Sequence, residues 1–235
     1  MKVLVFSDLH GNFDALEALQ GVEGKPDLVF FLGDVVGYGP EPKLCLSWIK
    51  ANVTDAVRGD HDEAVAANVP SRCPPELQSL SEDSRAHTRR MMSQSDLEYL
   101  DSLALEQTVD LGGTRFYLTH AAPSDHLGKD LPLTTAKETE LAQEIAELDV
   151  DVVFLGHTHV PAIRRVGSTV LVNPGSLGQP WHGTPSPTYA AWEDGELQIR
   201  HIHYNLIPVL RKLSLLPLDP EHVARLQAII QKGLG

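Results

Sequence analysis

Acidic residues and histidines gather at five places in this 235-residue chain, and most of these places also carry a glycine. The places are Asp8-Leu9-His10, Gly33-Asp34, Gly59-Asp60-His61-Asp62, His120 and Gly156-His157-Thr158-His159. Carboxylates and imidazoles without cysteine suit manganese, iron, zinc or magnesium rather than the thiolate site of a zinc finger. The residue types therefore predict a metal site.

Seven of these residues are candidate ligands, which is more than one four- to six-coordinate ion needs once water is counted. They are Asp8, His10, Asp34, Asp60, His120, His157 and His159. Two ions that share one carboxylate would use all seven. Two ions about 3.5–4 Å apart can hold a bridging hydroxide and clamp a phosphoryl group, which stabilises both the attacking and the leaving oxygen.

Each cluster directly follows an apolar run that predicts a β-strand. The predicted strands cover residues 2–6, 27–32, 55–57, 107–111, 115–119 and 151–155. Helical patterns follow several of them, over residues 13–19, 43–51 and 135–148. This alternation predicts a largely parallel sheet with helices packed on it. Because ligands of such sheets bind beyond the carboxyl ends of the strands, we expect the five clusters to converge.

The remaining segments predict an insert and a second β region. Residues 61–105 contain no strand pattern, and their Pro- and Ser-rich stretch between helical patterns predicts a helical insert or lid. Its last helix is expected to open with a capping box of Ser95 and Glu98. The last third predicts a β meander over residues 162–166, 169–172, 188–192 and 197–203, then a helix from Asp219 to about Gly233. No repeat and no interdomain linker stands out, so we expect a single domain over residues 1–235.

Composition limits the possible function classes. No apolar run approaches the roughly 18 residues of a membrane helix, and two cysteines, Cys45 and Cys73, cannot build a disulfide framework, which favours a cytoplasmic location. Nineteen basic against 32 acidic residues give a net charge of −13, which argues against nucleic acid as the main partner.

The order of the motifs resembles that of the calcineurin-like metallophosphoesterase superfamily, and more closely its compact prokaryotic YfcE/MJ0936-type phosphodiesterase branch. The matching segments are SDLHGN (7–12), GDVVGYGPEP (33–42), RGDHD (58–62), LTHAAPSD (118–125), GHTHVP (156–161) and NPGSLGQP (173–180). The resemblance implies an α/β fold, a four-layer αββα sandwich of two mixed β-sheets flanked by helices. It also implies a dinuclear metal centre.

The resemblance assigns roles to residues by position. The implied ligand sets are Asp8, His10 and His159 for one ion and Asp60, His120 and His157 for the other, with Asp34 bridging both. His61 would stabilise or protonate the leaving oxygen, and Asp62 would orient it. A histidine beside a carboxylate is a plausible acid in any case. Asn12, at the start of a helix, could contact phosphate or simply cap the helix.

Two positions depart from the family pattern. Asp60 stands where the motif usually has asparagine, and its extra negative charge is expected to tighten metal binding and to disfavour doubly charged phosphomonoesters. Trp181-His182 stands where relatives often have a basic residue. The tryptophan could form an aromatic platform for a base or aryl group, or could serve only in packing.

The predicted activity is metal-dependent phosphoester hydrolysis by in-line attack of a metal-bridging hydroxide. The expected cofactors are two divalent metal ions, manganese first, with iron, zinc, nickel or magnesium as alternatives. Small-molecule phosphodiesters such as cyclic nucleotides are the leading substrates, and neither nucleic acid nor a membrane is an expected partner. The alternatives are a phosphomonoesterase acting on phosphoproteins or nucleotides, a nuclease, and a non-catalytic scaffold, because the same fold serves as a protein-binding subunit in the retromer complex.

Overall fold

The computed structural model describes residues 1–235, and its strands form two five-stranded sheets. The first sheet has the order β10 (Glu196–His201), β9 (Thr188–Glu193), β1 (Lys2–Phe6), β2 (Leu28–Phe31) and β3 (Asp55–Ala56). The second has the order β4 (Glu106–Leu111), β5 (Thr114–Thr119), β6 (Val152–Phe154), β8 (Thr169–Asn173) and β7 (Ala162–Val166). Strands β1, β2 and β3 run parallel, as do β5, β6 and β8, whereas the other pairings are antiparallel.

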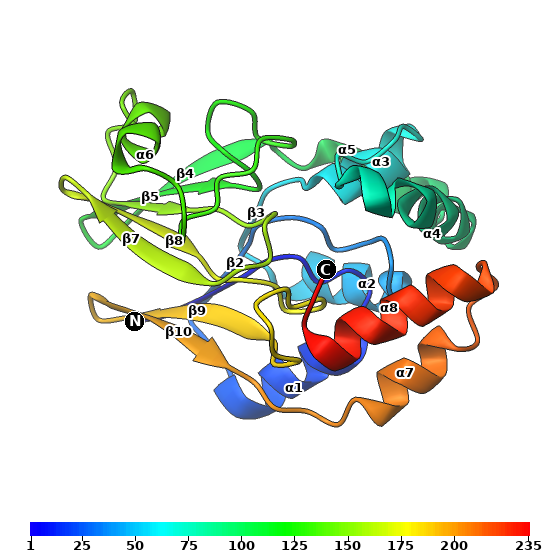
Figure 1. Ribbon diagram of the computed structural model, residues 1–235. Coiled ribbons are helices and arrows are strands. Elements are labelled where there is room, and N and C mark those ends of the chain that lie inside the picture. The colour runs from blue at the N-terminus through cyan, green and yellow to red at the C-terminus, as the bar shows by residue number, and fades with distance from the viewer.

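Helices flank the two sheets and also lie beyond one end of them (Figure 1). Helices α1 (Phe13–Glu23) and α2 (Pro42–Asn52) pack on the first sheet, and the short α6 (Glu138–Glu144) packs on the second. The helices beyond the sheet end are α3 (Asp60–Ala67), α4 (Gln78–Met91), α5 (Gln94–Ser102), α7 (Ile207–Leu213) and α8 (Pro220–Lys232), and a 3-10 turn, η1 (Pro75–Leu77), precedes α4. The predicted four-layer αββα sandwich of two mixed sheets is confirmed.

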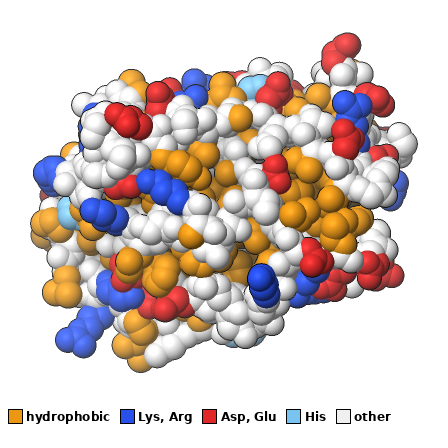
Figure 2. Space-filling view, turned by 180° about the vertical axis from the view of Figure 1, so that it is seen from behind, with side chains coloured by type: hydrophobic (Ala, Val, Ile, Leu, Met, Phe, Trp, Pro, Cys, Tyr) orange, Lys and Arg blue, Asp and Glu red, His pale blue; other side chains and the backbone are white.

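Charged side chains are mixed on the surface. On the face seen in Figure 2, Lys and Arg stand singly or in small groups among Asp and Glu, while hydrophobic side chains gather across the middle. That face carries no continuous basic patch.

None of the helices combines the length and the hydropathy that crossing a bilayer requires.

Strand alternation explains why β1 after Lys2, and all of β2, are apolar. Successive side chains of a strand point to opposite faces, and here both faces are covered. Val3 and Val5 face the second sheet, where they share a cluster with Phe116 and Phe154. The alternate residues of β1, such as Phe6, belong instead to the cluster under the helices.

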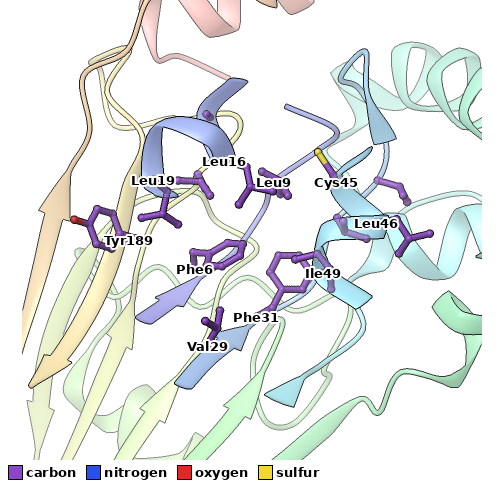
Figure 3. Packing of buried hydrophobic residues seen from close by; sticks show 14 of the residues in the cluster. Phe6, Leu9, Leu16, Leu19, Val29, Phe31, Cys45, Leu46, Ile49 and Tyr189 are labelled. Atoms are coloured by element: carbon purple, nitrogen blue, oxygen red, sulfur yellow. The ribbon is translucent and has the colours of Figure 1, made fainter. Parts of the chain in front are cut away.

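The layer of α1 and α2 anchors the carboxyl ends of β1 and β2 (Figure 3). Phe6 and Phe31, one from each strand, lie with ring centroids 5.2 Å apart. Around them pack Leu16 and Leu19 from α1 and Cys45, Leu46 and Ile49 from α2, all of them 2% exposed or less. The strand ends that lead into Asp8 and Asp34 therefore extend from a rigid, closely packed core.

Three local predictions differ from the structure. Helix α5 begins at a capping box of Ser93 and Asp96, not Ser95 and Glu98, because the Ser93 hydroxyl accepts from the Asp96 N–H and the Asp96 carboxylate accepts from the Ser93 N–H. Helix α6 covers only Glu138–Glu144 and has no side-chain cap. The C-terminal strands do not form one meander, since β7 and β8 join the second sheet and β9 and β10 the first.

Helix α7 (Ile207–Leu213) was not predicted at all. It has only seven residues and a proline in its first turn, so its own periodicity is too short to mark it. Helix α8 agrees with the prediction, with Asp219 as its N-cap and Gly233, in the left-handed conformation, as its C-cap.

Candidate metal centre

The structure brings all seven candidate ligands together at the carboxyl ends of β1, β2, β3, β5 and β6. Asp8, His10 and His159 form one group, and Asp60, His120 and His157 a second. Within each group the potential ligand atoms lie within 4.8 Å of one another. The two groups contain the same residues as the two ligand sets that the motif resemblance implies.

Asp34 lies between the two groups. Its Oδ2 is 3.6 Å from the Nε2 atom of His10 and 3.5 Å from the Nε2 atom of His120. Its other oxygen, Oδ1, accepts a hydrogen bond from the backbone N–H of His61 at 2.9 Å. One carboxylate oxygen therefore faces imidazoles of both groups, which is the position a bridging ligand needs.

The atoms within each group point toward a common centre. In the first group, His159 Nε2 lies 3.3 Å from Asp8 Oδ1 and 3.2 Å from His10 Nε2. In the second, Asp60 Oδ1 lies 3.5 Å from His120 Nε2 and 3.4 Å from His157 Nδ1. The remaining oxygen of Asp60 accepts the backbone N–H of Arg72 at 2.7 Å, which fixes the carboxylate.

Backbone carbonyls set the orientation of three of the four imidazoles. The pairs are His10 Nδ1 with Val36 O at 3.2 Å, His120 Nδ1 with Leu32 O at 2.7 Å, and His159 Nδ1 with Gln179 O at 2.7 Å. A carbonyl only accepts, so Nδ1 carries the proton in each ring and the Nε2 lone pair faces the centre. This is the usual way in which proteins prepare a histidine for a metal.

His157 is oriented the other way round. Its Nδ1 faces Asp60, and its Nε2 lies 3.3 Å from Oδ1 of Asp130, whose side chain is 73% exposed. Sequence reasoning missed Asp130, because it belongs to the irregular segment between β5 and α6 and no motif marks it. Only the folded loop brings this carboxylate to His157.

Five of the seven candidate ligands have a left-handed backbone. They are Asp8 (φ 54°), His10 (φ 45°), Asp34 (φ 60°), His157 (φ 67°) and His159 (φ 57°). Such conformations cost a non-glycine residue on the order of 1 kcal/mol or more each, and they cluster at functional sites. Hydrogen bonds between the loops hold them, among them Asp8 N to Gly33 O at 3.0 Å and His10 N to Asp34 O at 2.9 Å.

Two motif glycines leave room for the carboxylates. A β-carbon on Gly59 would lie 2.0 Å from Asp34 Oδ1. A β-carbon on Gly156 would lie 2.0 Å from Ser7 Oγ and 2.9 Å from Asp8 Oδ2. The glycine beside each ligand motif is thus explained by close approach of the neighbouring loop.

The donor set fits divalent cations. Asp8, Asp34 and Asp60 are each 3% exposed or less, and buried carboxylates need a partner of opposite charge. Asp8 Oδ1 and His120 Nε2 are buried yet make no hydrogen bond, although both face the ligand groups. Burial raises the pKa of Asp34 well above its usual range, while His61, His120 and His157 hold the pKa of Asp60 well below its own against the effect of burial. Cations would let all three carboxylates ionise together.

His61 belongs to neither of these two groups, although its ring also lies within 4.8 Å of potential ligand atoms of Asp34 and Asp60. Its ring centroid is 5.0 Å from that of His10 and 4.5 Å from that of Tyr38, and its Nε2 lies 4.0 Å from Asp60 Oδ2. Burial lowers the pKa of His61 to about 4. At neutral pH the ring is therefore uncharged, and its N–H can still donate a hydrogen bond.

Asp62 does not orient the His61 ring, which differs from the predicted role. Its carboxylate accepts the backbone N–H groups of Asp34 (2.8 Å), Val35 (2.9 Å), Val36 (3.3 Å) and Gly59 (3.1 Å), and no hydrogen bond joins it to His61. Burial raises the pKa of Asp62 to about 6, while the backbone donors favour its ionised form. The residue ties the loop that carries Asp34 to the start of α3.

Asn12 makes the helix cap that was the alternative to a phosphate contact. It is 2% exposed, and its side-chain oxygen caps α1 by accepting from the Ala15 N–H at 3.2 Å. Its amide nitrogen donates to Gly178 O and to the Tyr204 hydroxyl, both at 2.9 Å. With these groups satisfied inside the protein, Asn12 acts as a helix cap and as a link to the C-terminal region.

A pocket of about 270 Å³ opens onto the ligand groups. Its walls include Asp34, Asp60, His61, His157 and His159 from the centre. The other lining residues are Tyr38, Cys73, Pro74, Asp130, Pro132, Thr158, Val160 and Trp181. Cys73 and Pro74 belong to the helical insert, which therefore contributes one wall of the pocket.

Comparison with known proteins gives a consistent set of relatives. Residues 1–194 match the family model described as the calcineurin-like phosphoesterase superfamily domain. The chain is 25% identical over 236 residues to the uncharacterized protein MJ0912 of Methanocaldococcus jannaschii, covering 90% of this chain and 91% of that protein. It is 26% identical over 188 residues to phosphodiesterase YfcE of Escherichia coli, covering 79% and 84%. The crystal structure of a metallophosphoesterase from Sphaerobacter thermophilus superposes with a TM-score of 0.80 at 26% identity, covering 97% and 98% of the two chains.

Proposed function

This chain belongs to the calcineurin-like phosphoesterase superfamily and is a metallophosphoesterase, and we propose that it hydrolyses small-molecule phosphodiesters at a dinuclear metal centre. The observation that carries the proposal is the position of Asp34 Oδ2, which lies 3.6 and 3.5 Å from imidazole nitrogens of the two ligand groups. Asp34 would bridge two divalent ions. The remaining ligands would be Asp8, His10 and His159 for one ion and Asp60, His120 and His157 for the other.

When bound, two divalent ions supply Lewis acidity, which offsets the charge of the phosphoryl oxygens and makes water nucleophilic near neutral pH. The protein groups around them have separate tasks. His61 lines the pocket beside Asp34 and Asp60, where its N–H can donate to the oxygen of the leaving group. Asp62 acts as a positioning residue, because its hydrogen bonds with residues 34–36 fix the backbone that presents Asp34.

A preference for diesters follows from the charges. The pocket is lined by Asp34, Asp60 and Asp130 and by no Lys or Arg, so the ions would be the main positive charges near the substrate. Two divalent ions with three carboxylate ligands keep a single net positive charge, which attracts a dianionic monoester only weakly. A singly charged diester has only one negative charge to neutralise, so a single net positive charge at the centre is sufficient to attract it. The named activity of YfcE, a relative at 26% identity, supports this choice.

The proposal also covers the identity of the metal ions and the cellular location. Manganese is the ion we propose first, because a mixed set of carboxylates and imidazoles without cysteine suits it, and iron, zinc, nickel and magnesium are alternatives. We propose a cytoplasmic location, since the two cysteines are both unpaired.

A substrate panel on the metal-loaded protein tests the proposed function. The panel contains bis-p-nitrophenyl phosphate, p-nitrophenyl phosphate, 2′,3′- and 3′,5′-cyclic nucleotides, a dinucleoside polyphosphate and a phosphopeptide. We expect kcat/KM to be higher for the diesters than for the monoesters, and Asp34→Ala to abolish both activities. A larger kcat/KM for the monoesters or the phosphopeptide would replace the diesterase with a phosphatase. Absence of all hydrolysis at full metal content would reject the proposal.

A further inference from the structure

We propose that the pocket beside the metal centre takes a phosphodiester in which one alcohol arm carries a positive charge, an alkylammonium ester, with Asp130 as the contact for that charge. The inference rests on the proposed function and names its substrate class more narrowly. Its basis is the sign and the position of the charged side chains that line the pocket.

Asp130 stands on the pocket wall, one imidazole ring away from a candidate metal ligand. Its Oδ1 lies 3.3 Å from Nε2 of His157, and Nδ1 of the same ring lies 3.4 Å from Oδ1 of Asp60. No Lys or Arg forms an ion pair with Asp130, and its side chain is 73% exposed. The carboxylate is therefore open to a ligand that reaches along the wall from the phosphoryl group, and an ethylene arm suffices to cross one imidazole ring.

The charge balance of the loaded pocket leaves Asp130 uncompensated. Two divalent ions offset the buried carboxylates of Asp8, Asp34 and Asp60 together with the single charge of a bound diester. No Lys or Arg lines the pocket, so the protein supplies no cation to balance the remaining carboxylate. A positive group on the substrate supplies the missing charge and is complementary in sign to the wall that it meets.

The aromatic residues of the pocket do not offer a competing contact. Trp181 has one face on His159, with ring centroids 4.2 Å apart, and a β-carbon on Gly235 would lie 2.3 Å from its Cδ2 atom. Tyr38 is 3% exposed and packs against imidazoles of the centre. Neither ring has a free face for stacking, so Trp181 serves in packing, which is one of the two roles predicted for it. Discrimination between substrates therefore falls to the charge of Asp130.

The apolar walls of the same pocket suit the methyl groups of a quaternary ammonium. Pro74, Pro132 and Val160 line the pocket, and all three are half-buried. The two prolines have no N–H, so they offer no backbone donor to a further anionic group. A primary ammonium is strongly hydrated, whereas a trimethylated nitrogen presents apolar surface to such walls. We therefore expect a quaternary alkylammonium arm to fit best.

A pair of matched phosphinates tests the inference by binding alone. Methyl[3-(trimethylammonio)propyl]phosphinate carries the positive charge, and methyl(4,4-dimethylpentyl)phosphinate has a carbon in place of the nitrogen. Neither contains a P–O–C bond that a phosphoesterase cleaves. Isothermal titration calorimetry on the manganese-loaded protein should give a roughly three- to fivefold lower Kd for the charged compound, the upper range for an exposed ion pair. The preference should shrink at high ionic strength, because salt screens exposed charges.

Two substitutions that remove the same charge separate the pocket wall from the field of the whole protein, whose net charge is −13. Asp130→Asn should remove the preference. Glu196→Gln should keep it, because Glu196 is exposed and lies at the other end of the first sheet, where Glu193 pairs with both Glu196 and Lys2. Both Kd values are measured at saturating manganese for each variant, so that a change in metal affinity affects the two compounds alike.

Equal Kd values for the two compounds in the wild type, or a preference that survives in Asp130→Asn, would overturn the inference. Loss of the preference in both variants would assign it to the net charge of the protein and would overturn the inference as well. Hydrolysis of methyl p-nitrophenyl phosphate, followed in the same preparations, keeps the outcome apart from that of the proposed function. Hydrolysis together with equal Kd values rejects only the alkylammonium inference. A preference for the charged compound without hydrolysis rejects only the proposed diesterase.

Discussion

The Nε2 atom of His157 lies 3.3 Å from Oδ1 of Asp130. In the other three candidate ligand imidazoles, the nitrogen that points away from the centre is hydrogen-bonded to a backbone carbonyl. A backbone carbonyl inside the core cannot move far, but the Asp130 side chain is 73% exposed. His157 is therefore the one ligand whose orientation depends on a surface residue. If two ions bind as we propose, the one at Asp60, His120 and His157 should be the easier one to perturb without altering a ligand.

Removing the Asp130 side chain should weaken binding of one ion. Partners that orient a metal-binding histidine typically contribute about 10- to 100-fold in affinity, so we expect Asp130→Ala to raise one of the two metal Kd values by that factor. Asp130→Asn keeps an acceptor oxygen and should have a smaller effect. Metal titration by calorimetry measures both. If Asp130→Ala leaves both Kd values unchanged, the contact with His157 has no part in metal binding.

The position of Asp34 predicts two ions per chain. After manganese loading and removal of free metal, elemental analysis should give two ions for the wild type and one or fewer for Asp34→Ala, since both sites lose a ligand. Chelation of the wild type should also lower Tm, because ligands that bind only the folded state stabilise it by roughly 3 kcal/mol at 100 times their Kd. A metal content that stays at one ion per chain in the wild type would contradict the dinuclear assignment.

His61 should matter for turnover and not for metal content. Loss of a group that donates to the leaving oxygen costs about 10²- to 10⁴-fold in rate, so His61→Ala should show a loss of that size in kcat with two ions still bound. The loss should shrink for p-nitrophenolate, which leaves without protonation, and grow for an alkoxide. A variant that instead loses one ion would show that His61 is a ligand.

The candidate ligands could be predicted because each follows an apolar strand. Asp8 and Asp34 follow parallel strands of the first sheet and His120 a strand of the second, and parallel strands present their carboxyl ends at one edge of a sheet. That these two edges adjoin comes from the packing of the two sheets and not from strand order. The pocket walls could not be predicted in this way. Asp130 and Pro132 lie in an irregular segment, and Tyr38 and Trp181 depend on helices α7 and α8 behind them, one of which has no clear sequence signal.

The prediction for Asp62 differs from the structure for a geometric reason. Asp60 and Asp62 are two residues apart in the first turn of α3, and at about 100° per residue such positions point to nearly opposite sides. Asp60 therefore faces the imidazoles while Asp62 faces the backbone of residues 34–36. Adjacency to His61 in the sequence carried no information about this direction.

Asp96 predicts a pH-dependent contribution to stability away from the site. It caps α5 through Ser93 and accepts from Lys50 Nζ at 2.6 Å, and against the effect of burial these contacts lower its pKa to about 2. A folded-state pKa below the unfolded value means that the contribution is full above about pH 4 and fades as the pH falls toward 2. Asp96→Asn should therefore lose roughly 1 kcal/mol at pH 6, typical of a cap, and less at pH 3.

Urea denaturation of the wild type and of Asp96→Asn between pH 6 and pH 3 checks this. The other titrating groups contribute equally to both free energies of unfolding, so the difference between the two reports on Asp96. Lys50→Met offers a matched control, which should remove the ion pair and leave the cap. A difference that stays constant over this range would show that the Asp96 carboxylate is not held in its ionised form by these contacts.

Asp60 should tune both metal retention and substrate charge. Its Oδ1 lies 3.5 Å from His120 Nε2 and 3.4 Å from His157 Nδ1. The carboxylate therefore faces the two histidines of its ligand group and does not serve only at the start of a helix. A charged oxygen binds a dication better than an amide oxygen does, and Asp60→Asn should therefore weaken binding of one ion. The same change raises the net charge of the loaded centre by one, which should strengthen attraction for a dianionic monoester more than for a singly charged diester. The ratio of p-nitrophenyl phosphate to bis-p-nitrophenyl phosphate hydrolysis should rise accordingly.

Asp60→Asn keeps the shape of the side chain and can still accept from the Arg72 N–H, which the wild-type carboxylate does at 2.7 Å, so the loop after α3 should stay in place. Asp130→Asn is the matched control, because it removes one negative charge from the pocket wall without changing a ligand. If both variants raise the monoester ratio, the charge of the whole pocket sets the preference. If only Asp60→Asn does so, the charge of the metal centre sets it. An unchanged ratio in Asp60→Asn, measured at equal metal content, would discard the electrostatic argument for diesters even where the metal affinity falls.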